Sequence, residues 1–303
     1  MKPILASFAV TLALGYAALP GTAPAQQANA SSGSELTDVG AQERISFSDK
    51  LGMLSQHIPT AGCHLAKGIA AEGSLRMLAS AVTEFDSILT ALEFGDPSLN
   101  INGPEERRRT IAEIQNVRET WMPLKAAAEA MVAGDTSDEN LQVILDENMK
   151  VLNASQNLVS EITAQYSNPA DLVQADGFLI SIVGRQRMLT QTISKESCVL
   201  TSSQVTPETA ELLSGAIATF GNSLIALRDG MPSVGVRRPP TAEISDGLEV
   251  ATTQWDAVVP TLNAVLDGSE IDNETAARKF RDLNMLMVTM NGVTGMYAAA
   301  TKR

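Results

Sequence analysis

The sequence contains few aromatic residues, cysteines and histidines. Phenylalanine, tryptophan and tyrosine make up only 4% of the 303 residues, and there are two cysteines and two histidines. β-Sheets are enriched in aromatic and β-branched residues, whereas alanine, leucine and methionine, which are plentiful here, favour helices. We therefore expect an all-α protein.

Basic residues are also scarce. The chain has 22 Lys and Arg residues against 35 Asp and Glu residues, which gives a formal net charge of -13. Nucleic acids and anionic membranes both bind proteins through a basic face, so the composition argues against either partner. A site for a small anion would have to overcome the same negative field locally.

Beyond residue 19 no stretch approaches the roughly 18 apolar residues of a membrane span, so we expect no stable membrane insertion of the mature protein. The one apolar run, residues 4–19, follows a basic start and is ended by Pro20-Gly21. This pattern is typical of a signal peptide, and a membrane anchor is the alternative.

Two triplets with a small residue at each end follow the apolar run, and they finish at Ala25 and at Ala30. Such triplets are candidate signal peptidase sites. We interpret residues 1–25 as a cleaved signal peptide and residues 26–44, rich in Ala, Gln, Ser and Gly, as a flexible lead-in. The mature protein is then expected in the periplasm.

The rest of the chain contains an internal repeat. Residues of the first half recur about 135 positions later, and the matches include both cysteines and both tryptophans: Gln56 and Gln191, Cys63 and Cys198, Phe85 and Phe220, Trp121 and Trp255. We interpret the chain as a tandem duplication with copies at residues 45–167 and 168–303.

Each copy has the periodicity of four helices. Apolar residues recur every three or four positions, as on one buried helical face. In the second helices these are Leu75, Leu78, Val82, Phe85, Leu89 and Leu92, and then Leu213, Ile217, Phe220, Leu224 and Leu227. The fourth helices are predicted at about 138–166 and 273–301, and Gly and Pro residues separate the segments. The expected fold is two antiparallel four-helix bundles, with the junction at Asn168-Pro169.

The segment from Gly184 to Gln191, read as Gly-Arg-Gln-Arg-Met-Leu-Thr-Gln, resembles the motif that opens the periplasmic domain of type IV pilus methyl-accepting transducers and of nitrate/nitrite sensor kinases. A degraded copy lies at residues 47–63. The resemblance implies a four-helix sensor domain whose first helix carries a Gly-x-x-Arg-Met core. It also implies that the arginine of this core, Arg187 here, contributes to a nitrate site shared by two first helices.

The motif helix has a small, polar face beside its apolar face. Arg187 and Gln191 lie one turn apart on the polar face, and together they supply several N–H donors. Such a group suits a small planar oxyanion, which arginine binds through two parallel hydrogen bonds. We expect Arg185, Lys50 and Gln56 to assist.

A symmetric clamp of two arginines cannot form within one chain, because the first-copy counterpart of Arg187 is Gly52 and that of Arg185 is Lys50. This difference puts nitrate itself in doubt, unless two chains pair through their second copies. The alternative is purely structural, with Arg187 and Gln191 paired to a glutamate or a carbonyl of a neighbouring helix.

Other chemistry has weak support. His57 and His64 share a helical face and could hold a soft metal with Met53, but the second copy has Thr192 and Val199 instead. No nucleophile–base pair or phosphate loop is found, so we expect neither an enzyme, nor a metal, nor a cofactor.

Two functions remain at this stage. The first is a soluble periplasmic sensor-like protein that captures a small oxyanion and signals to a membrane sensor, transducer or transporter protein. The alternative is a non-catalytic helical interaction protein of the cell envelope that binds no ligand.

The two cysteines occupy equivalent positions in the two copies. Exported proteins meet an oxidising environment, in which a lone cysteine pair is normally joined. If the copies pack about a pseudo-twofold axis, residues near that axis meet their own counterparts. We therefore predict a disulfide between Cys63 and Cys198, with two buried free thiols as the alternative.

The signal peptide leads to a first testable prediction. Intact-mass spectrometry of the protein recovered from a periplasmic extract should show a chain that begins at Gln26 or at Ser31, because cleavage follows Ala25 or Ala30. A full-length chain found in the membrane fraction would contradict cleavage and favour the anchor.

Overall fold

The computed structural model describes residues 40–166 and 174–300. The predicted signal peptide, almost all of the lead-in and the predicted junction at Asn168-Pro169 lie outside these ranges. Eight α-helices and two short 3₁₀ turns account for the regular structure of the described residues, which contain no β-strand. The prediction of an all-α bundle fold is confirmed.

The first four helices form one bundle. They are α1 (Ala41–Ala66), α2 (Ala71–Phe94), α3 (Arg108–Val132) and α4 (Asp138–Tyr166). Helix α1 packs against α2 and α4, and α3 closes the ring because it also packs against α2 and α4. The predicted fourth helix, at about 138–166, agrees with the bounds of α4.

The last four helices repeat this arrangement. They are α5 (Gln174–Val199), α6 (Thr209–Asp229), α7 (Ala242–Leu266) and α8 (Asn273–Ala300). Helix α5 packs against α6 and α8, and α7 closes the second ring. Below, the first bundle means α1–α4 and the second bundle means α5–α8.

Each second helix is followed by the same loop. A 3₁₀ turn, η2 (Pro97–Leu99) or η3 (Pro232–Val234), lies inside a single antiparallel bridge. The loop begins with a glycine at positive φ, Gly95 at 83° or Gly230 at 79°. Glycine is required at Gly95, since a Cβ there would lie 2.6 Å from the Gly103 carbonyl oxygen.

Each bundle has its own hydrophobic core, and the two cores use equivalent aromatic pairs. Phe85 stacks on Trp121 with ring centroids 4.2 Å apart, and Phe220 lies 4.5 Å from Trp255. The predicted stripes of α2 and α6 supply most of the buried residues of these helices. Leu75 is an exception, because it lies in the exposed first turns of α2 and is 36% exposed.

Helix α6 is the one helix within residues 40–166 and 174–300 that is long and apolar enough to cross a membrane by length and composition. The same composition suits a helix at the core of a bundle. Leu213, Phe220 and Leu224 of α6 are buried in the second core. Packing in the bundle accounts for the buried third of this apolar stretch, whereas Leu212 and Ile225 of α6 are about half exposed.

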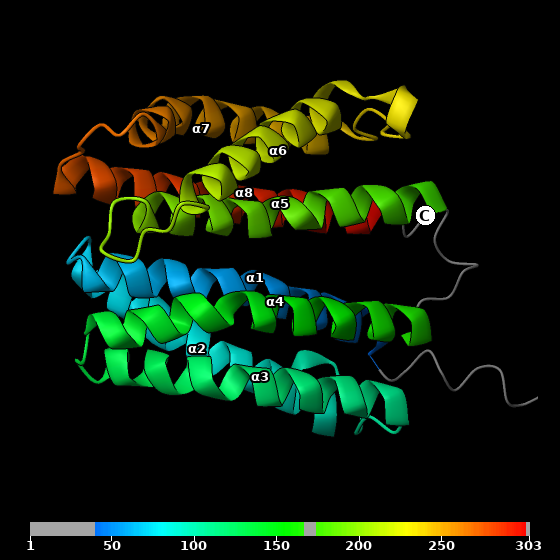
Figure 1. Ribbon diagram of the computed structural model, residues 1–303. Coiled ribbons are helices and arrows are strands. Elements are labelled where there is room, and N and C mark those ends of the chain that lie inside the picture. The colour runs from blue at the N-terminus through cyan, green and yellow to red at the C-terminus, as the bar shows by residue number, and fades with distance from the viewer. Residues whose placement is uncertain (1–39, 167–173, 301–303) are drawn as a thin grey trace, which may run out of the picture. The chain divides into compact units, whose positions relative to one another are not determined.

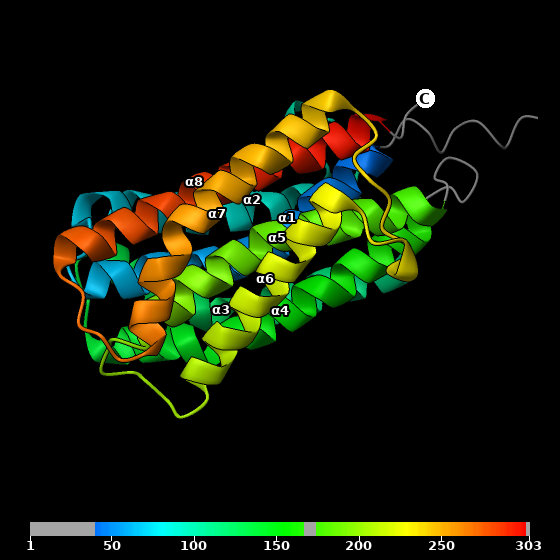
Figure 2. The ribbon, with the colours of Figure 1, turned by 90° about the horizontal axis from the view of Figure 1, so that it is seen from above.

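The two bundles contact each other mainly through α1 and α5. The two helices lie side by side in both views (Figures 1 and 2). The motif helix α5 therefore meets α1, the first helix of the first bundle.

Core packing gives a second prediction. Leu54 of α1 is 1% exposed, so Leu54→Ala should lower the free energy of unfolding by about 2–5 kcal/mol, through lost burial and a residual cavity. The matched control Met122→Ala removes a side chain that is 61% exposed and should change it by less than about 0.5 kcal/mol. Urea denaturation measures both, and equal effects would contradict the assigned core.

Candidate functional site

Helices α1 and α5 run parallel and in register. Contacts between them join residues at a nearly constant separation in sequence: 134 for His57 and Gln191, 135 for Cys63 and Cys198, and 134 for Lys67 and Thr201. An antiparallel pair would give separations that change steadily along the helix. Residues of α1 therefore lie within about one turn of their equivalents on α5, as the separations of 131 for Thr60 and Gln191 and 138 for Asp49 and Arg187 also show.

The predicted disulfide is present in the structure. Cys63 and Cys198 are joined, their Cα atoms lie 6.2 Å apart, and both residues are buried. The bond ties the C-terminal part of α1 to that of α5 and so links the two bundles covalently. No free cysteine occurs among the described residues.

Two equivalent amide pairs flank the α1–α5 contact. Gln56 Nε2 donates to Asn148 Oδ1 at 3.3 Å in the first bundle, and Gln191 Nε2 donates to Asn284 Oδ1 at 3.2 Å in the second. Each pair joins the first helix of a bundle to its fourth. Buried amides are costly to leave without partners, so these pairs fix the register of the helices they join.

Gln191 also makes contacts across the bundle interface. Its side-chain oxygen lies 2.9 Å from His57 Nδ1, and its backbone carbonyl accepts a hydrogen bond from Thr60 Oγ1 at 2.9 Å. Burial lowers the pKa of His57, although the bond to Gln191 raises it in part. The neutral imidazole therefore donates from Nδ1 to Gln191, so both the oxygen and the nitrogen of the Gln191 side chain have a partner.

Arg187 is paired with a carboxylate from the other bundle. Its Nη2 contacts Asp49 Oδ2 of α1, and its Nη1 donates to Asn291 Oδ1 of α8 at 2.8 Å. The side chain of Arg187 is 11% exposed and that of Asp49 is 43% exposed. The sequence reasoning allowed for a structural partner of Arg187 but did not identify Asp49.

The other predicted anion-binding residues do not gather around Arg187. Lys50 forms an ion pair with Glu84 of α2, and Arg185 is exposed. Gln56 is buried and bonded to Asn148. The five residues therefore make separate contacts, and the oxyanion site stays a prediction.

A buried ion pair lies one turn beyond Gln191. Lys195 Nζ is 2.8 Å from Glu196 Oε1, and both side chains are less than 8% exposed. The same ammonium donates to Asn148 Oδ1 of the first bundle at 2.9 Å. Sequence reasoning missed this pair, because Lys195 is equivalent to Thr60 and the repeat gives no sign of a charge there.

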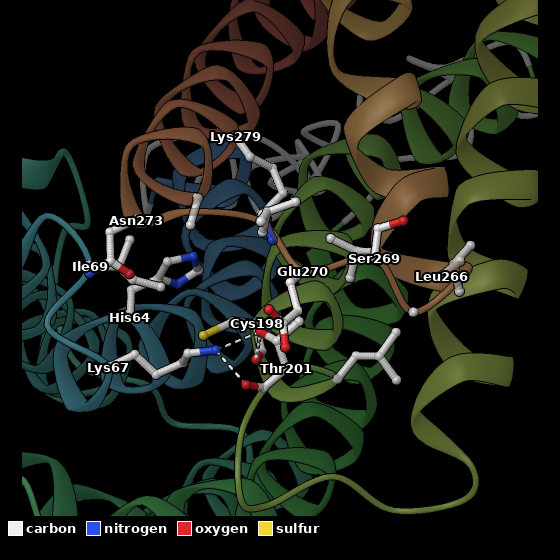
Figure 3. Close-up of a pocket in the computed structure, with 15 residues that line it drawn as sticks. His64, Lys67, Ile69, Cys198, Thr201, Leu266, Ser269, Glu270, Asn273 and Lys279 are labelled. Atoms are coloured by element: carbon white, nitrogen blue, oxygen red, sulfur yellow. Dashed lines mark hydrogen bonds between the residues drawn. The ribbon is translucent and has the colours of Figure 1, made fainter.

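A pocket of ≈ 470 Å³ lies beside the disulfide, where α1 and α5 end and α7 leads into α8. Its wall includes the polar or ionisable residues His64, Lys67, Thr201, Ser269, Glu270, Asn273 and Lys279. Figure 3 shows the Lys279 and Lys67 amines directed toward its interior from opposite sides. Both bundles contribute to this pocket.

The pocket wall contains two ammonium groups and a neutral imidazole. Burial, and then the charge of Lys67, lower the pKa of Lys279 to about 7. Burial is also the main reason that the pKa of His64 falls to about 3, with smaller contributions from Lys279 and Lys67. His64 accordingly donates from Nδ1 to the Thr60 carbonyl and stacks on Phe280.

Sequence reasoning missed Lys279. The residue lies on α8 at the spacing of buried neighbours, with Ala276 one turn before it and Leu283 one turn after it. That spacing was available in the sequence, but a lone lysine is usually exposed. No group of three His, Cys, Asp or Glu side chains suited to a metal ion is found among residues 40–166 and 174–300.

The disulfide gives a third prediction. Replacing both cysteines by serine should lower the free energy of unfolding by about 2–5 kcal/mol, because the bond constrains a long loop of the unfolded chain. Denaturant titration of the oxidised protein and the double variant measures this difference. Dithiothreitol should lower the free energy of unfolding of the wild type and leave that of the variant unchanged. A lower value for the variant as well would show that the reductant acts elsewhere.

One known protein family matches the second bundle. Residues 173–279 match the family model described as type IV pili methyl-accepting chemotaxis transducer N-term, and a search of curated proteins gives no match. The matched range covers α5, α6, α7 and the start of α8, including Arg187. The resemblance seen in the motif is confirmed for this range, which is similar to the N-terminal domain of these transducers, while the first bundle lies outside the match.

Proposed function

We propose that the protein is a non-catalytic sensor module of the periplasm that binds a small oxyanion at Arg187 and signals to a membrane sensor, transducer or transporter protein. The family match to the second bundle supports a sensor role. The observation that carries the proposal is the Arg187–Asp49 pair, which joins the motif arginine to the opposite bundle.

Asp49 contacts Nη2 of the guanidinium, while Nε donates to the Gly184 carbonyl at 3.4 Å and Nη1 donates to Asn291. A bound oxyanion would take the place of Asp49. A carboxylate and a nitrate ion are both planar anions that accept hydrogen bonds from one edge of an arginine. The Asp49 side chain is 43% exposed, so it can turn into solvent without a large desolvation cost. Partly exposed ion pairs contribute about 0–1 kcal/mol, and a ligand anion can compete with that.

Displacement of Asp49 would change the contact between the bundles. Asp49 belongs to α1 and Arg187 to α5, and the disulfide lies farther along both helices. An anion on Arg187 would therefore release one end of the α1–α5 interface while the other end stays tied. A partner that reads the free end would respond to occupancy, since a ligand shifts a two-state equilibrium by its difference in affinity for the states.

The interaction protein without a ligand is the second candidate. Gly52, buried on α1, stands where a second arginine would be needed for a symmetric clamp. Arg187 is also neutralised within the chain. In this case the Arg187–Asp49 pair would only hold the bundles together.

Calorimetric titration with nitrate and nitrite distinguishes the two candidate functions. We predict weak binding by the wild type and at least roughly tenfold tighter binding by Asp49→Asn, because the competing carboxylate is gone. Arg187→Ala should abolish binding. Arg281→Ala, which removes an exposed positive charge from α8, serves as the matched control and should bind like the wild type.

Failure of Asp49→Asn to bind either anion at millimolar concentration would exclude the arginine site and favour the interaction protein. Binding that persists in Arg187→Ala would also exclude it. Far-ultraviolet circular dichroism of each variant shows whether the helices are retained.

A further inference from the structure

The pocket beside the disulfide contains positive charge that no carboxylate of the described residues neutralises. Lys279 donates to the Ser197 carbonyl oxygen at 3.3 Å and to Ser197 Oγ at 2.9 Å, and both acceptors are neutral. Lys67 likewise donates to the carbonyl and hydroxyl oxygens of Thr201, each at 2.6 Å. An ammonium group has three donors, so each lysine retains one.

The position of Lys279 is unfavourable without an anion. The residue is only 3% exposed, and burial of a charged group costs free energy unless a counter-charge compensates it. Glu270 also lines the pocket, but it is exposed and forms no ion pair with either lysine within the described part of the chain. In a chain with a net charge of -13, this is an uncommon local concentration of positive charge.

The wall also has an apolar part. Its side chains come from α7, α8 and the loops that follow α1, α5 and α7: Ile69, Leu200, Val265, Leu266, Ile271 and Ala276. A volume of ≈ 470 Å³ is within the usual range for a small organic ligand. A bare inorganic ion would leave most of this apolar surface unused.

We propose that this pocket binds a small organic carboxylate, with the carboxylate at Lys279 and Lys67 and the hydrocarbon part against the apolar wall. This site is separate from the one proposed at Arg187, and the two proposals rest on different residues. Because both bundles line the pocket, a bound ligand bridges them next to the disulfide.

Equilibrium dialysis of the whole mature protein against labelled hexanoate tests the site. Acetate and nitrate serve as competitors, because they carry the same negative charge with little or no hydrocarbon chain. We expect saturable binding of hexanoate that is roughly tenfold or more tighter than acetate, because methylene groups leave water on binding. Hexanoate bound no better than acetate or nitrate would overturn the carboxylate assignment.

Lys279→Met tests the charged end. The substitution removes a buried ammonium and keeps a long side chain, so it should leave the fold intact and weaken hexanoate binding roughly tenfold or more. Lys150→Met, at an exposed lysine of α4, is the matched control and should bind like the wild type. Undiminished binding by Lys279→Met would overturn the proposal, and Arg187→Ala should have no effect on it.

The affinity should also fall as the pH rises from about 6 to about 8.5, because Lys279 loses its proton in this range. The other titratable groups of the pocket do not reverse this trend. The pKa of His64 of about 3 keeps it neutral throughout, and Glu270 is exposed and forms no ion pair with either lysine. Burial lowers the pKa of Lys67, so any loss of its proton acts in the same direction. An affinity independent of pH would contradict the role of Lys279.

Discussion

The parallel, in-register packing of α1 against α5 is the constraint on which the rest of the structure depends. It brings Cys63 to Cys198 and places Asp49 of one bundle beside Arg187 of the other. It also brings the ends of both helices together, where the pocket containing Lys279 forms. Each bundle could bury its own core alone, but the disulfide, the Arg187–Asp49 ion pair and the pocket all require both bundles.

The α1–α5 interface is polar for a buried contact between helices. Desolvation of polar groups is costly, so such an interface persists only where partners are supplied. The Gln191 amide and the Lys195–Glu196 ion pair meet this requirement within the chain, whereas Gln56 meets it through its amide nitrogen and leaves Oε1 without a partner. Lys279 meets it only in part, since its acceptors are neutral. The interface thus combines contacts that fix the register with charged groups that an anion could engage.

The helices and the cysteine pairing were predictable because they depend on local periodicity and on the repeat. Apolar spacing and Gly and Pro breaks placed the fourth helix at about 138–166, as observed. The partner of Arg187 was not predictable, because Asp49 lies 138 residues away and an isolated aspartate shows no preference for one partner. Lys279 was missed for a different reason. Its burial results from the packing of α8 against the ends of α1 and α5, and no local pattern in the sequence indicates this packing.

Peptide mapping of the monomeric protein without reduction tests this packing most directly. If α1 and α5 lie parallel with equivalent residues facing, mass spectrometry of a digest of periplasmic material should find the Cys63 and Cys198 peptides joined within one chain. Two alkylatable thiols, or a cross-link found only between chains, would contradict the packing and with it both proposed anion sites between the bundles.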